Sequence, residues 1–361
     1  MSCAPSPDGK YMDAFGKAPS QSAFDALLSE RAEAFGVSAA AVYYEVTGEA
    51  IIETFLGTDQ DIDENSVFQA ASLSKAVAAA GILMLAQARD ISPDADIRPY
   101  VTALDWEDIP GGDAPVTLRA LLSHTRGVNV SGFPGYAQGE PMPTNLELIK
   151  GESPANTDAL RLDGETGVFT YSGGGYQLAQ LFAETVSGEP FPKLIERLVF
   201  TPLGMTKSFF DEALVESQIA PLTVATADAG LLPIEGFPLT LRGSWNNYPE
   251  AAAAGLWTTP KDYAKFIRAL MQAVNGKTPA GLPKAVAELM LTPVTPNYAL
   301  GLAMQDWDDI DNRSFGHAGA NRGYKCRFLA LPAQQKFAVI MTNAPGGAAL
   351  AKEVVFGLMS G

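Results

Sequence analysis

Cysteine and histidine are scarce in this chain of 361 residues, which has only Cys3, Cys326, His124 and His317. Two cysteines cannot form a disulfide framework. Two histidines are too few for a histidine-rich metal site, and no CxxC or HExxH spacing occurs, so metal catalysis is not favoured. Cys326 lies in an apolar run and is expected to be a small buried hydrophobic residue.

Basic residues and long apolar runs are also in short supply. The chain has 25 basic and 41 acidic residues, which gives a net charge of -16. Because an acidic surface repels phosphate backbones, nucleic acid is not an expected partner. No run reaches the roughly 18 to 20 apolar residues that span a bilayer, so no transmembrane segment is expected.

The first twenty residues lack the apolar segment of a signal peptide. They are rich in proline, glycine and serine, and we predict a loose leader. The triplet Ser2-Cys3-Ala4 resembles the cleavage point of a bacterial lipoprotein, in which Cys3 would carry lipid. A chain whose signal peptide has been removed would look the same, so the location stays open at this point.

Material for a core is ample, with 47% hydrophobic and 18% charged residues. β-prone runs at residues 39–46 and 50–56 are joined by a hairpin signal around Thr47-Gly48-Glu49, and further strands are expected within 313–345. Gly127 and Gly188 are candidate helix C-caps. Helices are predicted at residues 22–35, from Ala71 onward, and within 116–125, 174–188, 258–274 and 348–359.

The order of these elements is strands, a long helical region, strands and a helix. It favours an α/β sandwich (α+β) in which an antiparallel sheet is flanked by helices. We expect a discontinuous sheet domain from residues 1–66 and 255–361, with a helical domain at residues 67–254 inserted into it. A cleft where two such units meet is a common place for an active site.

Ser72 and Lys75 are polar residues at the start of a helix that is otherwise apolar nearly all round. Residues three apart share a helix face, so Ser72 Oγ and Lys75 Nζ can meet. A serine becomes a nucleophile when a neighbouring base takes its proton. A neutral lysine amine can be that base, and burial in apolar surroundings disfavours the ammonium form. Ser74 is the alternative nucleophile, and a capping serine at a solvated helix start is the alternative reading of the pair.

Two further segments could complete such a site. Tyr171 precedes the glycine run 173–175, where the backbone can approach a ligand, and a tyrosine there could move a proton between Ser72 and a leaving group. Residues 315–323, Phe-Gly-His-Ala-Gly-Ala-Asn-Arg-Gly, lie at a strand boundary. Their small residues would let a substrate lie along the strand edge, and a backbone N–H could join that of Ser72 in an oxyanion hole.

The motifs SxxK, YxG and HxG occur here in that order, on a helix, a loop and a strand. The set resembles the three active-site motifs of the serine β-lactamase and penicillin-binding-protein superfamily, and it is most similar to the class C branch with family VIII carboxylesterases and D-stereospecific peptidases. The resemblance runs from about Ala39 to near the C-terminus. It rests on the segments FQAASLSK, LLSHTRGV, GFPGY, FTYSGGGYQLAQL, PLGMTKSFF, AAAAGLWTTPKDYAKF and GHAGANRGY.

The resemblance implies a β-lactamase/transpeptidase-like fold and a serine hydrolase that works through an acyl-enzyme on Ser72. Lys75 and Tyr171 would share the acid–base work, and the amides of Ser72 and Ala320 would form the oxyanion hole. No metal or organic cofactor is implied. The substrate would be a small ester, amide or β-lactam.

The third motif, with His317 and Gly319, departs from the family pattern KTG, because a histidine is mostly neutral at neutral pH whereas a lysine carries a permanent charge. The family asparagine two positions after the tyrosine is Gly173 here, which argues against an efficient β-lactamase. Arg322 could bind a substrate carboxylate bidentately, or it could be a surface residue. Tyr136 and Trp257 are candidates for the lining of the cleft, while His124 is expected to be structural.

Several functions therefore stay open. The first is a carboxylesterase on small acyl esters with weak β-lactam hydrolysis. The second is a D-stereospecific peptidase, such as a DD-carboxypeptidase, or a β-lactamase. The third is a catalytically silent, ligand-binding relative. A Ser-His-Asp triad is a weaker option because no GxSxG elbow occurs. The family habit favours a periplasmic or other extracytoplasmic location in bacteria, with a cytoplasmic one left open.

Overall fold

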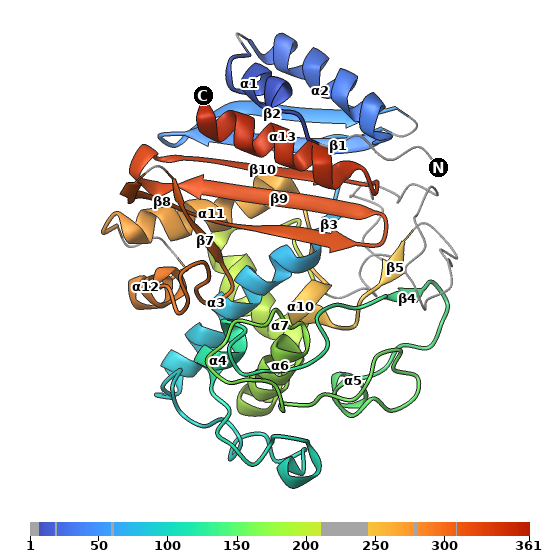
Figure 1. Ribbon diagram of the computed structural model, residues 1–361, viewed down its shortest axis with the longest axis vertical. Coiled ribbons are helices and arrows are strands. Elements are labelled where there is room, and N and C mark those ends of the chain that lie inside the picture. Colours follow the sequence, from blue (N-terminus) through green and yellow to red (C-terminus); the bar gives the residue numbers. More distant parts are fainter. Residues whose placement is uncertain (1–6, 19, 59–60, 211–244, 278–280, 308) are drawn as a thin grey trace.

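The computed structural model describes residues 7–18, 20–58, 61–210, 245–277, 281–307 and 309–361. Its main sheet has six antiparallel strands in the order β2-β1-β10-β9-β8-β7 (Figure 1). The expected sheet from both ends of the chain is confirmed. Its strands are β1 (Ala39–Val46), β2 (Glu49–Gly57), β7 (Ala303–Trp307), β8 (Asp309–Asn321), β9 (Tyr324–Leu331) and β10 (Lys336–Thr342).

Helices cover both faces of this sheet because alternate residues along each strand point to opposite sides. Ala40 and Val42 of β1 belong to one hydrophobic cluster, together with residues of α1 (Gly9–Gly16), α2 (Gln21–Phe35) and α13 (Gly347–Ser360). Ala41 and Tyr43 belong to a second, larger cluster on the other face, which includes α11 (Pro260–Val274). The sheet therefore lies between two layers of helices.

The N-terminal segment differs from the prediction. Residues 9–16, expected in a loose leader, form α1, whose Phe15 is only 1% exposed and packs against Phe24 of α2. The backbone N–H of Asp8 also donates to the carboxylate of Glu353 on α13. These contacts anchor a segment whose composition alone indicated a loop. Cys3, the residue that would carry lipid if the lipoprotein-like triplet were a cleavage site, lies outside the described residues.

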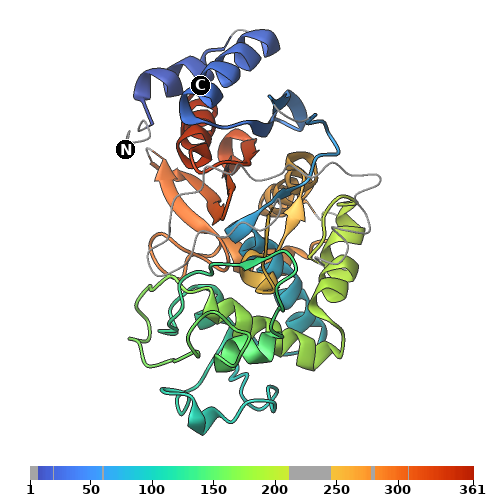
Figure 2. The same cartoon turned by 90° about the vertical axis from the view of Figure 1, so that its right-hand side faces the viewer.

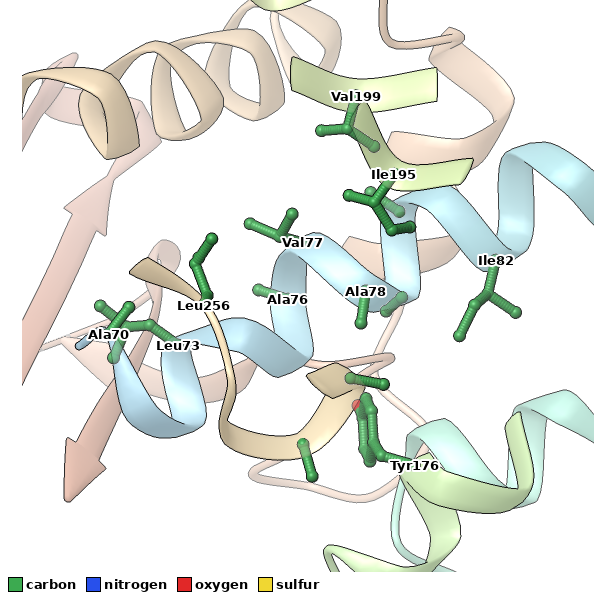
Figure 3. Close-up of a cluster of buried hydrophobic side chains, with 14 of the residues drawn as sticks. Ala70, Leu73, Ala76, Val77, Ala78, Ile82, Tyr176, Ile195, Val199 and Leu256 are labelled. Carbon is green, nitrogen blue, oxygen red and sulfur yellow. The ribbon is translucent and has the colours of Figure 1, made fainter. Parts of the chain in front are cut away.

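The helix that carries Lys75 runs through the middle of the molecule. A short 3-10 turn, Ala71–Leu73, leads into α3 (Ser74–Ala88), and residues 74–83 are all buried. Figure 3 shows Ile195, Val199, Leu256 and Tyr176 around it. The stretch Ala71–Ala88 is long and apolar enough to cross a membrane, contrary to our expectation, but 78% of it is buried inside the molecule. A core helix of a folded protein has this same character.

The remaining helices and strands come between β2 and β7 in the sequence. Of these, α4, α5 and α6 lie in the half of the molecule away from the sheet (Figures 1 and 2). The remaining elements are β3 (Phe68–Gln69), α4 (Leu118–Leu122), β4 (Tyr136–Ala137), α5 (Asn145–Lys150), α6 (Gly174–Ser187), α7 (Phe191–Ile195), α8 (Thr201–Leu203), β5 (Asn246–Asn247), α10 (Ala251–Ala254), β6 (Trp257–Thr258) and α12 (Lys284–Leu291). In the described part, residues 67–254 add no strand to the six-stranded sheet. The division into two domains stays a prediction, since one hydrophobic cluster joins the sheet to these helices.

One predicted helix is shorter than expected. The helix expected within residues 116–125 is only α4, which ends at Leu122 with Ser123 as its C-cap, so Gly127 is not a cap. His124 has a φ of 61°, in the left-handed region, and this backbone conformation cannot continue the helix. Gly188, by contrast, does cap α6 in the left-handed conformation. The short α4 matters because it places His124 in the candidate site.

Candidate active site

Ser72 lies in the 3-10 turn before α3, where a strand passes close by. Ala70 accepts a hydrogen bond from the Cys326 thiol of β9 at 2.8 Å, and its N–H donates to Leu256 O at 2.8 Å. A Cβ on Gly319 of β8 would lie 2.5 Å from Ala70 O, so only glycine lets this strand approach so closely. The third predicted motif therefore packs directly against the turn of the predicted nucleophile.

Lys75 points back at Ser72, as the spacing predicted. Its Nζ lies 3.1 Å from Ser72 Oγ and also donates to Ala253 O at 2.7 Å. The lysine is 2% exposed, whereas Ser72 is partly accessible. A neutral amine at this position would accept the hydroxyl proton along the same line.

Ser74, the alternative nucleophile, is fully buried. Its hydroxyl donates to Ala71 O and accepts a hydrogen bond from Leu256 N at 3.0 Å. Both bonds hold the backbone around the turn. The geometry therefore assigns Ser74 a structural role and leaves Ser72 as the accessible hydroxyl of the pair.

Tyr171 reaches the same point from another loop. Its ring lies 5.1 Å from Lys75 Nζ and 4.3 Å from the ring of His124. The two residues that flank Tyr171 are both tied to His124, because Thr170 N donates to His124 O at 2.8 Å and Ser172 N donates to His124 Nδ1 at 3.1 Å. His124 thus holds the tyrosine loop in place, which agrees with its expected structural role.

His317 of β8 lies behind this group and is nearly buried, with 7% of its surface exposed. Burial and the nearby Lys75 lower the pKa of His317 to about 3, so the ring is neutral at physiological pH. Its Nε2 lies 3.0 Å from the hydroxyl of Tyr298, and its Nδ1 lies 2.8 Å from Ala318 O. A neutral imidazole with both nitrogens engaged does not replace the permanent charge of a lysine.

Two residues of the site were missed from the sequence. Tyr298 joins His317 to His124, whose Nε2 lies 3.2 Å from the Tyr298 hydroxyl. Asn321, at the end of β8, donates to Gln69 Oε1 at 2.9 Å and to Ala254 O at 3.1 Å. Tyr298 lies in no pattern that signals chemistry. Asn321 lies within the predicted third motif, but its partners are far away in the sequence. Asn321 therefore connects β8 to Gln69, three residues before Ser72, and to Ala254, the neighbour of the carbonyl that Lys75 contacts.

The three predicted substrate-binding residues are all largely buried. Trp257 is 1% exposed and stacks on Phe209, so it belongs to the core and not to the surface of a cleft. Tyr136 is 3% exposed, and its hydroxyl accepts a hydrogen bond from Asn156 N at 2.9 Å. Arg322 is 7% exposed, which rules out the surface position considered for it. Tyr136 and Trp257 were predicted to line the cleft, but both aromatic side chains are packed inside the protein.

Gly173 shows why this chain lacks a side chain two positions after Tyr171. A Cβ on Gly173 would lie 2.4 Å from the ring of Phe133, far inside van der Waals contact. Phe133 is itself only partly buried. An apolar ring therefore fills the space that a polar side chain at position 173 would use.

Comparison with known proteins identifies the family of the chain. A family profile described as Beta-lactamase matches residues 24–355. The chain belongs to the beta-lactamase family. Its antiparallel sheet, flanked by helices on both faces, is the fold of that family, which also includes penicillin-binding-protein homologues.

Individual members of the family differ in what their names say they do. Penicillin-binding protein 4 of Amycolatopsis lactamdurans is 26% identical, over 93% of this chain and 87% of that protein. Lovastatin esterase of Penicillium rubens is 25% identical over 64% of this chain, which spans only 61% of the esterase. The solved structure of a D-amino acid amidase from Ochrobactrum anthropi superposes with a TM-score of 0.69 at 18% identity, over 97% of each chain. The family makes this chain a serine hydrolase by fold and leaves its substrate open.

Proposed function

We propose that this protein is a carboxylesterase that acts on small acyl esters through an acyl-enzyme on Ser72. The observation that carries the proposal is the 3.1 Å contact between Lys75 Nζ and Ser72 Oγ, with the Tyr171 ring 5.1 Å from the same nitrogen. Attack by Oγ on the ester carbonyl transfers the hydroxyl proton to Lys75. The amides of Ser72 and Ala320 hold the developing oxyanion.

Tyr171 delivers a proton to the departing alkoxide, and the acyl group stays on Ser72 Oγ. A water molecule then attacks the acyl-enzyme while the same pair of side chains takes up its proton. The carboxylic acid leaves, and the Ser72 hydroxyl is restored. General acid–base catalysis of this kind contributes about 10² to 10⁴-fold to a rate.

Three observations favour an ester over a β-lactam. The ring of Phe133 fills the space beside Gly173, so an apolar surface stands where an amide would hold a β-lactam side chain. The neutral His317 offers no permanent charge for a substrate carboxylate. A relative named as an esterase matches 64% of the chain.

Turnover of a substrate panel tests the proposal. We expect p-nitrophenyl butyrate to be hydrolysed with a kcat/KM about 100-fold above that for a chromogenic cephalosporin or a D-Ala-D-Ala peptide, a ratio that pocket shape and one unmatched polar group can produce. Faster release of D-alanine, or faster opening of the cephalosporin, would contradict the esterase proposal. No turnover and no acyl-enzyme with any of the three would support a silent relative.

Substitution of Gly173 tests the role of Phe133. Gly173→Asn forces the new side chain against the ring, so we expect it to destabilise the protein by about 1 to 3 kcal/mol and to lower ester hydrolysis about tenfold. Adding Phe133→Ala should restore stability, and Phe133→Ala alone is the matched control. The measurements are urea unfolding and ester kinetics. If Gly173→Asn has wild-type stability and activity, the ring does not fill this space.

A D-stereospecific amidase or peptidase is the second candidate, and an amidase structure covers 97% of this chain. Arg322 follows Asn321 at the end of β8, where its backbone N–H donates to Tyr248 Oη at 2.9 Å, and a guanidinium that bound the substrate carboxylate would favour this candidate. The D-Ala-D-Ala peptide in the panel decides between the two candidates. An extracytoplasmic location, with lipid on Cys3, stays a further part of the proposal.

A further inference from the structure

We propose that Tyr298 is a positioning residue, whose hydroxyl joins His124 and His317 in one directed hydrogen-bond chain between the Tyr171 loop and β8. The inference rests on the proposed acyl transfer at Ser72. The hydroxyl oxygen of Tyr298 lies 3.2 Å from His124 Nε2 and 3.0 Å from His317 Nε2, and Tyr298 is 4% exposed. This hydrogen-bond chain extends the proposed function because it connects the loop of Tyr171 to β8, the strand that carries Ala320.

The proton positions in this chain follow from its two ends. Ser172 N–H can only donate, so His124 Nδ1 accepts and carries no proton. His124 Nε2 then bears the proton and donates to Tyr298. At the other end Ala318 O can only accept, so His317 Nδ1 bears its proton, and His317 Nε2 accepts from the Tyr298 hydroxyl. With both rings neutral, this arrangement satisfies the contacts of all four imidazole nitrogens. The Tyr298 hydroxyl also contacts the hydroxyl of Tyr176, which itself donates to Leu122 O at 2.9 Å.

The surroundings keep both rings neutral. Burial lowers the pKa of His124 well below its usual value, and burial is also the largest cause of the low pKa of His317. Burial raises the pKa of Tyr298, which keeps its hydroxyl able to donate. The titratable and charged groups that face His317 come from five separate segments: they are Lys75, His124, Tyr171, Tyr298 and Arg327.

The segment of Tyr298 is itself tightly held beside the catalytic helix. A Cβ on Gly301 would lie 3.0 Å from Lys75 O, and Gly301 N donates to Leu122 O at 3.0 Å. The Tyr298 segment is thus packed between α3 and the end of α4. The Tyr298 hydroxyl hydrogen-bonds both the imidazole that holds the Tyr171 loop and the imidazole on β8.

Histidine NMR measures the proton positions directly, because the chain has only two histidines. In ¹⁵N-histidine-labelled protein between pH 8 and pH 5, we expect one ring protonated at Nε2 (His124) and the other at Nδ1 (His317), with both neutral. His124→Gln assigns the spectrum. Two rings in the same tautomer, or a ring that charges in this range, would overturn the inference. The wild-type protein alone shows whether the two rings have different tautomers, and no substrate is needed.

Tyr298→Phe removes the hydroxyl and keeps the ring. We expect kcat for the best ester to fall about tenfold, as for one lost hydrogen bond, with KM within about twofold. The lost donor had stabilised neutral His317, so its pKa rises, and the acid limb of the kcat profile should move to higher pH. The NMR signal of His317 should change in the same variant.

Tyr43→Phe is the matched control, because Tyr43 is also a buried tyrosine whose hydroxyl donates to a side chain, Glu45, at 3.2 Å. It lies on β1, outside the proposed chain, and should leave the pH profile and both histidine signals unchanged. An unaltered pH profile in Tyr298→Phe, with ester turnover present, overturns the positioning role. Absence of ester turnover in the wild type counts against the proposed function alone, since the tautomers are measured without substrate.

Discussion

Ser72→Ala is expected to abolish detectable turnover of every substrate that the wild-type protein hydrolyses, with a fall in kcat of about 10³ to 10⁶-fold. The hydroxyl is the atom that Lys75 Nζ contacts at 3.1 Å, and its loss removes the covalent route entirely. What then remains is catalysis by the oxyanion amides and by binding alone. Steady-state kinetics with p-nitrophenyl butyrate measures the loss.

Covalent labelling separates Ser72 from its neighbour Ser74. Intact mass after exposure to an activated ester or to penicillin should show an acyl adduct on the wild type and on Ser74→Ala, but none on Ser72→Ala. Ser74→Ala is expected to be less stable, because the Ser74 hydroxyl bridges Ala71 O and Leu256 N. Full activity or an adduct in Ser72→Ala would show that the assignment of the nucleophile is wrong.

Lys75→Met is expected to lower kcat/KM about 10³-fold, because the apolar side chain fills a similar volume and cannot take the Ser72 proton. Removal of the amine also leaves Ala253 O without this donor, which costs about 1 to 3 kcal/mol of stability. Lys75→Arg should be as inactive as Lys75→Met, because a guanidinium does not give up its proton. The measurements are ester kinetics and urea unfolding for each variant.

Lys336→Met is the control for the loss of a buried lysine. Lys336 is 6% exposed and donates to the backbone carbonyl of Gly361 at 3.0 Å, much as Lys75 donates to Ala253. We expect it to reduce stability without a change in kcat/KM. Retention of activity in Lys75→Arg would contradict the role of Lys75 as a base and would leave it only a charge to supply.

Local patterns predicted much of the fold. The strand run at residues 39–46 is β1 with the same bounds, and Thr259 and Pro260 begin α11 as an N-cap and a first helical residue. These features depend on residues close together in the sequence, whose backbone preferences act before any packing. The prediction of a loose leader was wrong for the opposite reason, because the contact of Phe15 with α2 is made only in the folded protein.

In the site, too, contacts between residues close in the sequence were predictable, and contacts between distant residues were not. Ser72 and Lys75 are three residues apart on one helical turn, so their contact was readable from spacing alone. The contact between His124 and Tyr298 joins residues 174 apart, and no local pattern reports it. The fit of Phe133 over Gly173 and the burial of Trp257 are likewise properties of packing.

By itself the sequence predicted the contact between Ser72 and Lys75, the order of the three motifs and the antiparallel sheet, because each follows from helical spacing or from strand patterns. Only the tertiary structure decided which hydroxyl is accessible, which charge states the two imidazoles have, and what fills the space beside Tyr171. Those properties depend on burial and on hydrogen bonds between segments that meet only after the chain has folded.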